Sequence, residues 1–368
     1  MKIGVDARPL SYPLTGIGIY LRHVLDGIQR MDRQNEYYLI SNAPIDYDLE
    51  NPGWHRFEGS LKPKLLSTLW MQITVPWYAA KMGLDLFWAT RHHLPALLPP
   101  GIRTVVTVHD VVHRRHPGTM ALPNLLVDGA LMALSLRRAE AVIAVSQATA
   151  ADIREQFGIS PARLYTIHHG TSPLPTKSDQ GRGARSRLPE NYFLFVGTLD
   201  PRKNFERIFS AFEMLKPEGR GLHLVIVGAE GWKNHAFLKM LRNHPLRHYV
   251  HLEGYVPRDR LLSYYQNSIC LVFPSLYEGF GLPILEAMAS GTPVLTSNGS
   301  SMSEVAGDAA LLVNPYDMHG IADAMDKLAR DRVLRERLIR RGLERVAQFS
   351  WKKCAAETLG VLNSLEEG

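Results

Sequence analysis

The chain has 368 residues, of which 45% are hydrophobic and 21% charged, and its net charge is +6. This is the composition of an ordinary soluble globular protein, and the length predicts two domains that can each bury a sizeable core. The mild positive charge favours anionic partners, but no long run of Lys and Arg and no alternation of aromatic and basic residues indicates a nucleic-acid-binding protein.

The N-terminus and the cysteines indicate a compartment. The opening residues, MKIGVDARPL, reach Asp6 within a strand-like run, so we see no apolar segment of signal-peptide length and expect no export. Cys270 and Cys354 lie far apart in apolar surroundings and match no ligand or redox pair. These features predict a cytoplasmic protein with two inert thiols.

The first element is a strand over residues 2–6, followed by the glycine-containing turn TGIGIY and a helix to about residue 31. Strand, glycine turn and helix is the opening of dinucleotide-binding folds. The third glycine of that motif is missing, because Leu21 and Arg22 follow Tyr20. The pattern therefore does not predict a nicotinamide cofactor.

Further strands are predicted in the first half, with helical segments between them, and the alternation implies a parallel sheet with right-handed crossovers. The predicted strands are residues 36–41, 84–88, 103–109, 141–146 and 163–167. The motif Asp46-Tyr-Asp48 resembles a metal-binding Asp-x-Asp, but it lies in an acidic, loop-like segment with no strand leading into it. We predict no metal site there.

Residues 65–84 form the most apolar long stretch, and four interruptions make it unable to span a bilayer: Ser67, Gln72, Pro76 and Lys81. The segment is predicted to be an amphipathic helix. It either packs into the core of the first domain or touches a membrane surface, and basic residues would help the second role: Lys62, Lys64, Arg114 and Arg115.

The β-rich run TVVTVHD delivers His109 and Asp110 to the carboxyl end of the first sheet, where ligand clefts form. A neutral histidine can donate a hydrogen bond to a sugar hydroxyl or a carbonyl. The alternative is a purely structural histidine. The sequence leaves both open.

Residues 170–190 are rich in Gly, Pro, Ser and charge without periodicity, which predicts a linker, and the second domain starts at about Tyr192. Its predicted strands are residues 192–196, 222–228, 250–254, 269–273, 293–296 and 309–313. Arg202 and Lys203 follow the first of these strands. Two cations at that strand end would neutralise a leaving diphosphate without a metal, or would simply be surface charges.

The most informative stretch is Leu271 to Gly291, which predicts a buried strand, a glycine loop and a helix over residues 282–289. Glycines in the loop let the backbone approach a ligand, and the free N–H groups of a helix start favour a phosphate. Glu286 falls on an apolar helix and needs a partner. The alternative is a turn whose glycines and glutamates serve only the local structure.

The spacing Glu278-x7-Glu286, with Gly-Phe-Gly-Leu-Pro inside it, resembles the donor-site motif of retaining glycosyltransferases of the GT-B fold, family 4. The resemblance covers nearly the whole chain. It implies an α/β protein of two doubly wound, Rossmann-like domains that face each other across a cleft. The predicted domains are residues 1–190 on the acceptor side, residues 191–348 for the nucleotide sugar, and a final helix, 349–368, that crosses back to the first domain.

The resemblance also implies roles for individual residues. His109 and Glu278 position the sugar, Arg202 and Lys203 stabilise the leaving diphosphate, and Glu286 accepts from the ribose hydroxyls. Further donor contacts are implied at Gly16, Gly18, Thr198, Val256, Gly279, Phe280, Gly281 and Leu282. Thr198 stands where the family commonly has an arginine, and Arg202 is expected to substitute for it in part.

The sequence therefore predicts a metal-independent, retaining hexosyltransferase of polysaccharide biosynthesis. The form Gly-Thr-Leu-x-Pro-Arg-Lys-Asn resembles mannosyl- and related transferases, so the expected donor is GDP-mannose, with GDP-rhamnose or a UDP-hexose as alternatives. The expected acceptor is a saccharide or lipid-linked saccharide, and the protein is expected to be cytoplasmic, with peripheral contact at the membrane left open. The alternatives are an inactive nucleotide-sugar-binding partner subunit and a sugar-nucleotide epimerase of similar architecture.

Overall fold

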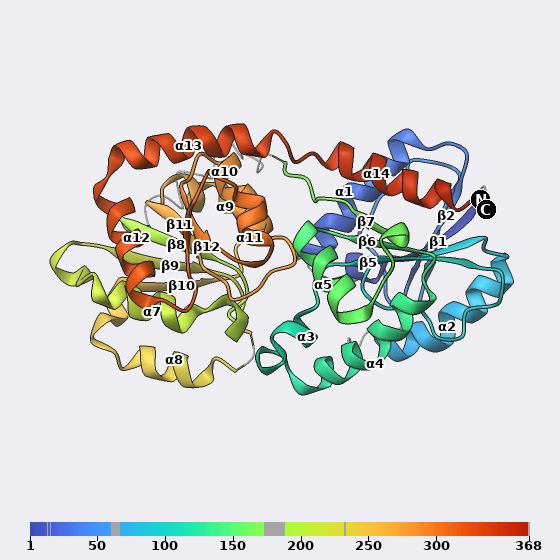
Figure 1. Ribbon diagram of the computed structural model, residues 1–368, viewed down its shortest axis with the longest axis horizontal. Coiled ribbons are helices and arrows are strands. Elements are labelled where there is room, and N and C mark those ends of the chain that lie inside the picture. Colours follow the sequence, from blue (N-terminus) through green and yellow to red (C-terminus); the bar gives the residue numbers. More distant parts are fainter. Residues whose placement is uncertain (13, 15, 60–66, 173–187, 232, 367–368) are drawn as a thin grey trace. The chain divides into compact units, whose positions relative to one another are not determined.

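The computed structural model describes residues 1–12, 14, 16–59, 67–172, 188–231 and 233–366, which fall into two compact units (Figure 1). The first unit comprises Met1–Arg114, Leu122–Gly170 and Ser350–Gly368. The second comprises Arg115–Ala121 and Thr171–Phe349. The short segment 115–121 therefore belongs to the second unit, although the sequence analysis assigned it to the first domain.

The first unit is built on a parallel sheet in the order β3-β2-β1-β4-β5-β6-β7. Its strands are β1 (Lys2–Asp6), β2 (Glu36–Ser41), β3 (Trp54–Glu58), β4 (Leu86–Ala89), β5 (Arg103–Val108), β6 (Ala141–Ala144) and β7 (Leu164–Thr166). Its helices are α1 (Gly16–Met31), α2 (Ser67–Met82), α3 (Val112–Arg115), α4 (Leu122–Arg138), α5 (Gln147–Phe157) and α14 (Trp351–Ser364). Helices α1 and α14 lie on one side of the sheet, and α2 and α4 lie on the other (Figure 1).

The second unit is built on a parallel sheet in the order β10-β9-β8-β11-β12-β13. Its strands are β8 (Tyr192–Val196), β9 (His223–Val227), β10 (Val250–Gly254), β11 (Cys270–Phe273), β12 (Val294–Ser297) and β13 (Leu311–Val313). Its helices are α7 (Phe205–Met214), α8 (His235–Arg242), α9 (Arg258–Gln266), α10 (Leu282–Ala289), α11 (Ser300–Ala306), α12 (Met318–Arg330) and α13 (Arg332–Val346). Helices α7 and α8 lie on one side of this sheet, opposite α9 and α10 (Figure 1).

Apolar strands covered by helices on both faces hold each sheet together. Strand β8 reads YFLFV, and its first four residues are buried. Continuous apolar strands of this kind are typical of parallel sheets whose two faces are both covered. Helix α1 buries Leu21, Val24, Leu25 and Ile28 at helical spacing on one face. The predicted α/β class, with two doubly wound domains, is confirmed.

Each predicted strand is present, with ends that differ from the prediction by no more than two residues. Strand β3 was missed. It carries His55, Arg56 and Glu58, so it does not read as an apolar run, and it lies at the edge of the sheet, where charged residues are common. Most of the predicted linker, residues 173–187, lies outside the described residues.

Helix α14 packs tightly against α1 within the first unit. A Cβ placed on Gly27 of α1 would lie 2.3 Å from the Cβ of Ala355 on α14, so the two helices approach to a distance that only glycine allows at this position. Both cysteines, Cys270 and Cys354, are buried, and burial raises the pKa of both thiols. No helix in the described part of the chain is both long and apolar enough to cross a bilayer.

Candidate functional site

The strand order of the second sheet reverses between two neighbouring strands, which is called a topological switch point. Strands β8 and β11 are neighbours, with β9 and β10 beyond β8 and with β12 and β13 beyond β11. The loops after β8 and β11 therefore separate at the carboxyl ends of the strands. In open α/β sheets, ligands bind in the crevice at such a switch point.

Three predicted site residues meet at this point. The guanidinium Nη1 of Arg202 lies 2.6 Å from Oε2 of Glu278, and Nζ of Lys203 lies 2.6 Å from Oε1 of the same carboxylate. Burial alone would raise the pKa of Glu278, but the charges of Arg202 and Lys203 outweigh it and lower the pKa to about 2. The site thus holds two cations around one ionised carboxylate. The sequence analysis placed these residues at one sheet edge but did not predict that they pair with one another, and their roles with the diphosphate and the sugar stay predictions.

The loop after β8, residues 197–204, carries Arg202 and Lys203 and is called the cationic loop. Hydrogen bonds hold it against the loop after β11. The carbonyl of Arg202 accepts from the amide of Leu276 at 2.8 Å. Asn204, in the left-handed region at φ 63°, donates from Nδ2 to the carbonyls of Pro274 and Pro315 at 2.9 and 2.6 Å. A donor bonded to two otherwise separate loops fixes their relative position. The sequence analysis assigned no role to Asn204.

The predicted glycine loop leads directly into helix α10. Gly281 has φ 105°, a conformation that favours glycine, and α10 begins at the next residue, Leu282. Phe280 is buried and packs edge-on against Phe349, with the ring centroids 5.9 Å apart. Gly279, Phe280 and Gly281 thus connect Glu278 to the start of α10 at Leu282, and a helix start favours negative charge.

Two serines at the start of α11 form hydrogen bonds with backbone carbonyls of this glycine loop. The hydroxyl of Ser300 donates to the carbonyl of Glu278 at 2.5 Å, and the hydroxyl of Ser301 lies 2.8 and 2.9 Å from the carbonyls of Glu278 and Phe280. Ser300 adopts φ 55°, an uncommon conformation for serine. The loop is therefore positioned by residues that the sequence analysis missed.

We expect Ser301→Ala to destabilise the second unit by about 1–3 kcal/mol, because it removes a buried hydroxyl that bonds to the carbonyls of Glu278 and Phe280. It should also raise KM for the donor more than it lowers kcat, because the loop loses its support. Urea unfolding and steady-state kinetics measure the two effects. Ser303→Ala, on the same helix with only a 3.4 Å bond to the Ser300 carbonyl, is the control. Equal effects in both variants would contradict the positioning role.

Glu286 lies on α10 and has two partners within the second unit. Arg258 Nη1 lies 2.8 Å from Oε1, and the hydroxyl of Tyr265 donates to Oε2 at 3.1 Å. Burial raises the pKa of Glu286 despite the nearby charge of Arg258. The sequence predicted that this carboxylate needs a partner, and Arg258 and Tyr265 supply one. Its role with ribose stays a prediction.

The loops after β8, β9 and β10 meet through glycines. The amide of Gly228 donates to the carbonyl of Gly254 at 2.8 Å, and a Cβ on Gly228 would lie 2.0 Å from the carbonyl oxygen of Gly197. Two other predicted donor residues, Thr198 and Val256, are half-buried in the loops after β8 and β10. They therefore lie at the same edge of the sheet as Arg202 and Lys203.

In the first unit, His109 follows β5 and is buried. Its Nε2 lies 2.9 Å from the carbonyl oxygen of Thr90, so this nitrogen carries the proton and donates. The ring of Tyr20 meets it edge-on at 5.0 Å. Burial lowers the pKa of His109 to about 4, so the ring is neutral at pH 7, as the sequence analysis assumed.

This buried histidine predicts a pH-dependent stability. Its pKa lies below the ordinary value of 6.5, so the unfolded state binds the proton first, and stability that is complete above pH 6.5 falls as the pH drops toward 4. His109 alone accounts for on the order of 3 kcal/mol. Urea unfolding between about pH 7.5 and pH 5 should show a smaller loss in His109→Gln than in the wild type. An identical loss in both proteins would contradict this assignment.

Gly16 and Gly18 differ from the prediction, which placed them in a loop. They lie in the first turn of α1, where Gly16 is exposed and Gly18 is buried. A Cβ on Gly18 would lie 2.9 Å from the carbonyl oxygen of Pro9, so glycine is needed here for packing. A contact of either residue with the donor stays a prediction.

The acidic pair Asp46 and Asp48 lies in irregular chain after β2, and Asp46 is exposed. Across the residues with described positions, no group of three or more His, Cys, Asp or Glu side chains is placed to hold a metal ion.

Comparisons with known proteins identify the family. Residues 14–173 match the family described as Glycosyltransferase Family 4, and residues 178–345 match the family described as Glycosyl transferases group 1. The O-antigen chain mannosyltransferase B of Escherichia coli is 30% identical, over 99% of this chain and 100% of its own length.

Solved structures share the fold. Sucrose-phosphate synthase from Thermosynechococcus elongatus has a TM-score of 0.81 and 22% identity, with 100% of this chain and 99% of that chain covered. Anabaena HepE in complex with UDP-glucose has a TM-score of 0.75 and 18% identity, with 99% of this chain and 100% of that chain covered. The predicted GT-B architecture is thereby confirmed, and the chain is a glycosyltransferase that belongs to the group 1, family 4 enzymes.

Proposed function

We propose that this enzyme transfers mannose from GDP-mannose to a saccharide or lipid-linked saccharide in polysaccharide biosynthesis, with retention of the anomeric configuration and without a metal ion. The observation that carries the proposal is the contact of Arg202 and Lys203 with Glu278, each at 2.6 Å, at the switch point of the second sheet. Two fixed cations there suit a diphosphate leaving group.

In the proposed reaction, the bond between the anomeric carbon and the diphosphate oxygen breaks while the acceptor oxygen bonds to the same face of that carbon. The acceptor proton passes to an oxygen of the departing diphosphate, so GDP and the glycoside are the products. Arg202, Lys203 and the start of α10 stabilise the negative charge that develops on the diphosphate. No nucleophile of the protein is required.

The other proposed roles follow the family resemblance. Glu278, ionised because its pKa is about 2, accepts hydrogen bonds from hydroxyls of the sugar. Glu286 accepts from the ribose, and the backbone near Val256 contacts the base. His109, in the first unit, helps to position the sugar: its Nε2 proton is donated to the carbonyl of Thr90, so its Nδ1 is the nitrogen that can accept a hydrogen bond from a sugar hydroxyl.

The choice of mannose rests on the relative from Escherichia coli, whose name is O-antigen chain mannosyltransferase B and which this chain matches from end to end. The sequence Gly197 to Asn204, GTLDPRKN, supports the same choice by resemblance. A cytoplasmic location is proposed because GDP-mannose would have to be available to the enzyme there.

The test is a panel of nucleotide sugars with purified protein. A ligand at about 100 times its Kd adds about 2.7 kcal/mol to the stability, so GDP-mannose should raise the melting temperature with and without a chelator. GDP-, UDP-, dTDP- and ADP-sugars are compared, and product analysis follows with a mannose-containing acceptor. A shift with UDP-sugars alone would overturn the GDP-mannose assignment, and a shift abolished by chelator would overturn the metal-free mechanism.

We also propose peripheral contact with an anionic membrane through one face of α2. Leu69, Ile73 and Trp77 are spaced four residues apart, and each is more than half exposed. Trp70, Met71, Val75 and Ala79 of the same helix are buried, so α2 both packs into the core and exposes an apolar stripe. The Lys62 and Lys64 that the sequence analysis invoked lie outside the described residues.

Sedimentation with phosphatidylglycerol vesicles tests this contact. The double variant Ile73→Ser and Trp77→Ser should bind at least about fivefold more weakly, because the membrane gains less buried apolar surface. Val333→Ser, which removes an exposed apolar residue from α13 in the second unit, should bind like the wild type. Equal binding by all three proteins would remove α2 as the contact surface.

A further inference from the structure

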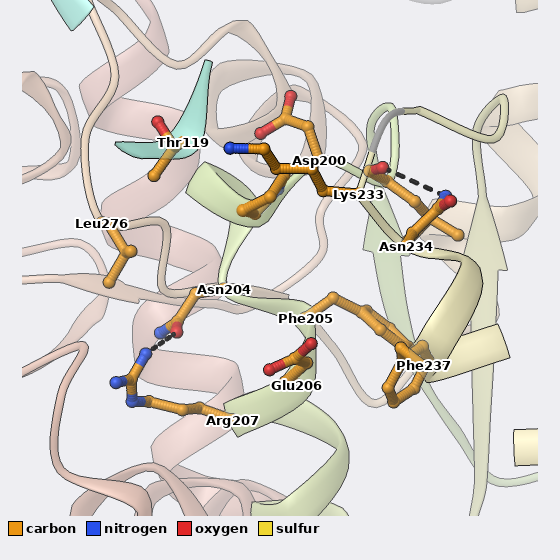
Figure 2. Close-up of a pocket in the computed structure, with 12 residues that line it drawn as sticks. Thr119, Asp200, Asn204, Phe205, Glu206, Arg207, Lys233, Asn234, Phe237 and Leu276 are labelled. Atoms are coloured by element: carbon orange, nitrogen blue, oxygen red, sulfur yellow. Dashed lines mark hydrogen bonds between the residues drawn. The ribbon is translucent and has the colours of Figure 1, made fainter. Parts of the chain in front are cut away.

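A pocket of about 230 Å³ opens beside the cationic loop of the second unit (Figure 2). It is lined mainly by the turn after β8, the first turn of α7, the turn after β9 and the start of α8. Thr119, from the segment 115–121 of the same unit, also lines it. None of the predicted donor residues is among its lining residues.

Two residues that line this pocket each carry a buried side-chain oxygen that lacks a hydrogen-bond partner among the described residues: Oδ1 of Asp200 and Oδ1 of Asn234. Asp200 is 5% exposed and Asn234 is 8% exposed, and both line the pocket. The Nδ2 group of Asn234 donates to the carbonyl of Leu199 at 3.3 Å, which leaves its oxygen available (Figure 2). An unpaired buried polar atom is costly, so two acceptors of this kind favour a ligand with hydrogen-bond donors.

The rest of the lining limits the ligand further. Phe205 and Phe237 pack edge to face, with their centroids 4.8 Å apart, and give the pocket an aromatic wall. Two acidic residues, Asp200 and Glu206, are balanced by two basic residues, Arg207 and Lys233. A neutral ligand is therefore favoured over an anion or a cation.

Size excludes a large ligand. The volume lies below the range of about 300–1,000 Å³ that is usual for pockets of drug-sized ligands, which leaves room for little more than one six-membered ring. A neutral ring with several hydroxyl donors, one apolar face and this size is a pyranose. The hydroxyls would donate to Asp200 and Asn234, and the apolar face would lie against Phe205 or Phe237.

We propose that this pocket is a second saccharide-binding site, separate from the donor site, that holds one neutral hexose unit of a glycan. The proposal deepens the proposed function, on which it rests for the choice of a mannoside as the probe. Such a site would keep a saccharide product or acceptor attached to the second unit without involving the reacting bond.

Saturation-transfer NMR with methyl α-D-mannopyranoside and the full-length protein tests the site. The wild type and Lys203→Ala should both show a saturable signal, because Lys203 belongs to the donor site. Asn234→Ala should reduce the signal at least about fivefold, because it removes a hydrogen-bond acceptor from the pocket. Asn243→Ala is the matched control, since this exposed asparagine lies at the opposite end of α8.

A second variant keeps the test decisive if Asn234→Ala fails to fold. Glu206 is exposed in the first turn of α7, so Glu206→Trp should fold and should fill the pocket, again removing the signal. A signal lost in Lys203→Ala but kept in Asn234→Ala and Glu206→Trp would overturn the proposal, as would the lack of a saturable signal with the wild type. Stabilisation by GDP-mannose is measured on the same sample, so a failed second site is distinguished from a failed donor assignment.

Discussion

Replacement of Lys203 by alanine is expected to lower kcat/KM for sugar transfer by at least about 10², the usual loss when a positioned transition-state charge is removed. Nζ of Lys203 lies 2.6 Å from the Glu278 carboxylate, and Lys203 is buried, so alanine removes a fixed cation from this site. The charge on the departing diphosphate then loses one of its two cations. Most of the loss should fall on kcat, because the diphosphate becomes more negative as the bond breaks.

Lys203→Ala also leaves Glu278 with Arg202 as its remaining cation. The pKa of Glu278, now about 2, should rise toward its ordinary value, and the stability gained from this pair should shrink. Lys239→Ala removes an exposed lysine from α8 and is the control, because it makes the same substitution and loses the same charge away from the site. A folded Lys203→Ala protein with nearly unchanged turnover would contradict the assignment of Lys203 to the leaving-group site.

The contact of Arg202 and Lys203 with Glu278 shows what the sequence could predict. Each strand of the pair, β8 and β11, is a short apolar run that ends in glycine or proline, so both loops were placed at carboxyl ends of strands. Local patterns do not show that β8 and β11 are neighbours. The sequence analysis placed both loops at one edge of the sheet, and the structure shows that the two strands are neighbours.

The supporting residues could not be predicted, because their roles depend on loops far apart in sequence. Ser300 and Ser301 at the start of α11 have the local pattern of helix caps. In the structure the N-cap is Gly299, without a side-chain bond, and both hydroxyls instead donate to the loop after β11. Asn204 likewise bonds to two distant carbonyls.

The second saccharide site has no sequence signature either. Asp200 and Asn234 are separated along the chain by an entire strand and helix, and neither follows a known motif spacing. The pocket becomes visible only when β8 and β9 are paired and their turns lie side by side. Unpaired polar atoms are a property of the folded structure, and sequence patterns do not report them.

Gly228→Ala is expected to destabilise the second unit by about 3 kcal/mol or more, because two costs combine. Gly228 has φ 149°, a conformation that side-chain-bearing residues rarely adopt, and the new Cβ would lie 2.0 Å from the carbonyl oxygen of Gly197. Relief requires the turns after β8 and β9 to move apart. Because Gly197 begins the loop that carries Lys203, the same shift should raise KM for the nucleotide sugar.

Gly219→Ala provides the matched control for this change, since a Cβ on Gly219 meets nothing within 4 Å and its backbone lies outside the left-handed region. It should alter the free energy of unfolding by no more than about 0.5 kcal/mol. Urea unfolding of both variants, with donor KM measured on the folded fraction, separates a local steric cost from a general intolerance of alanine. If Gly228→Ala unfolds like the wild type, the close approach of the two turns does not hold the cationic loop in place, and the hydrogen bonds of Asn204 and of the Arg202 carbonyl position it instead.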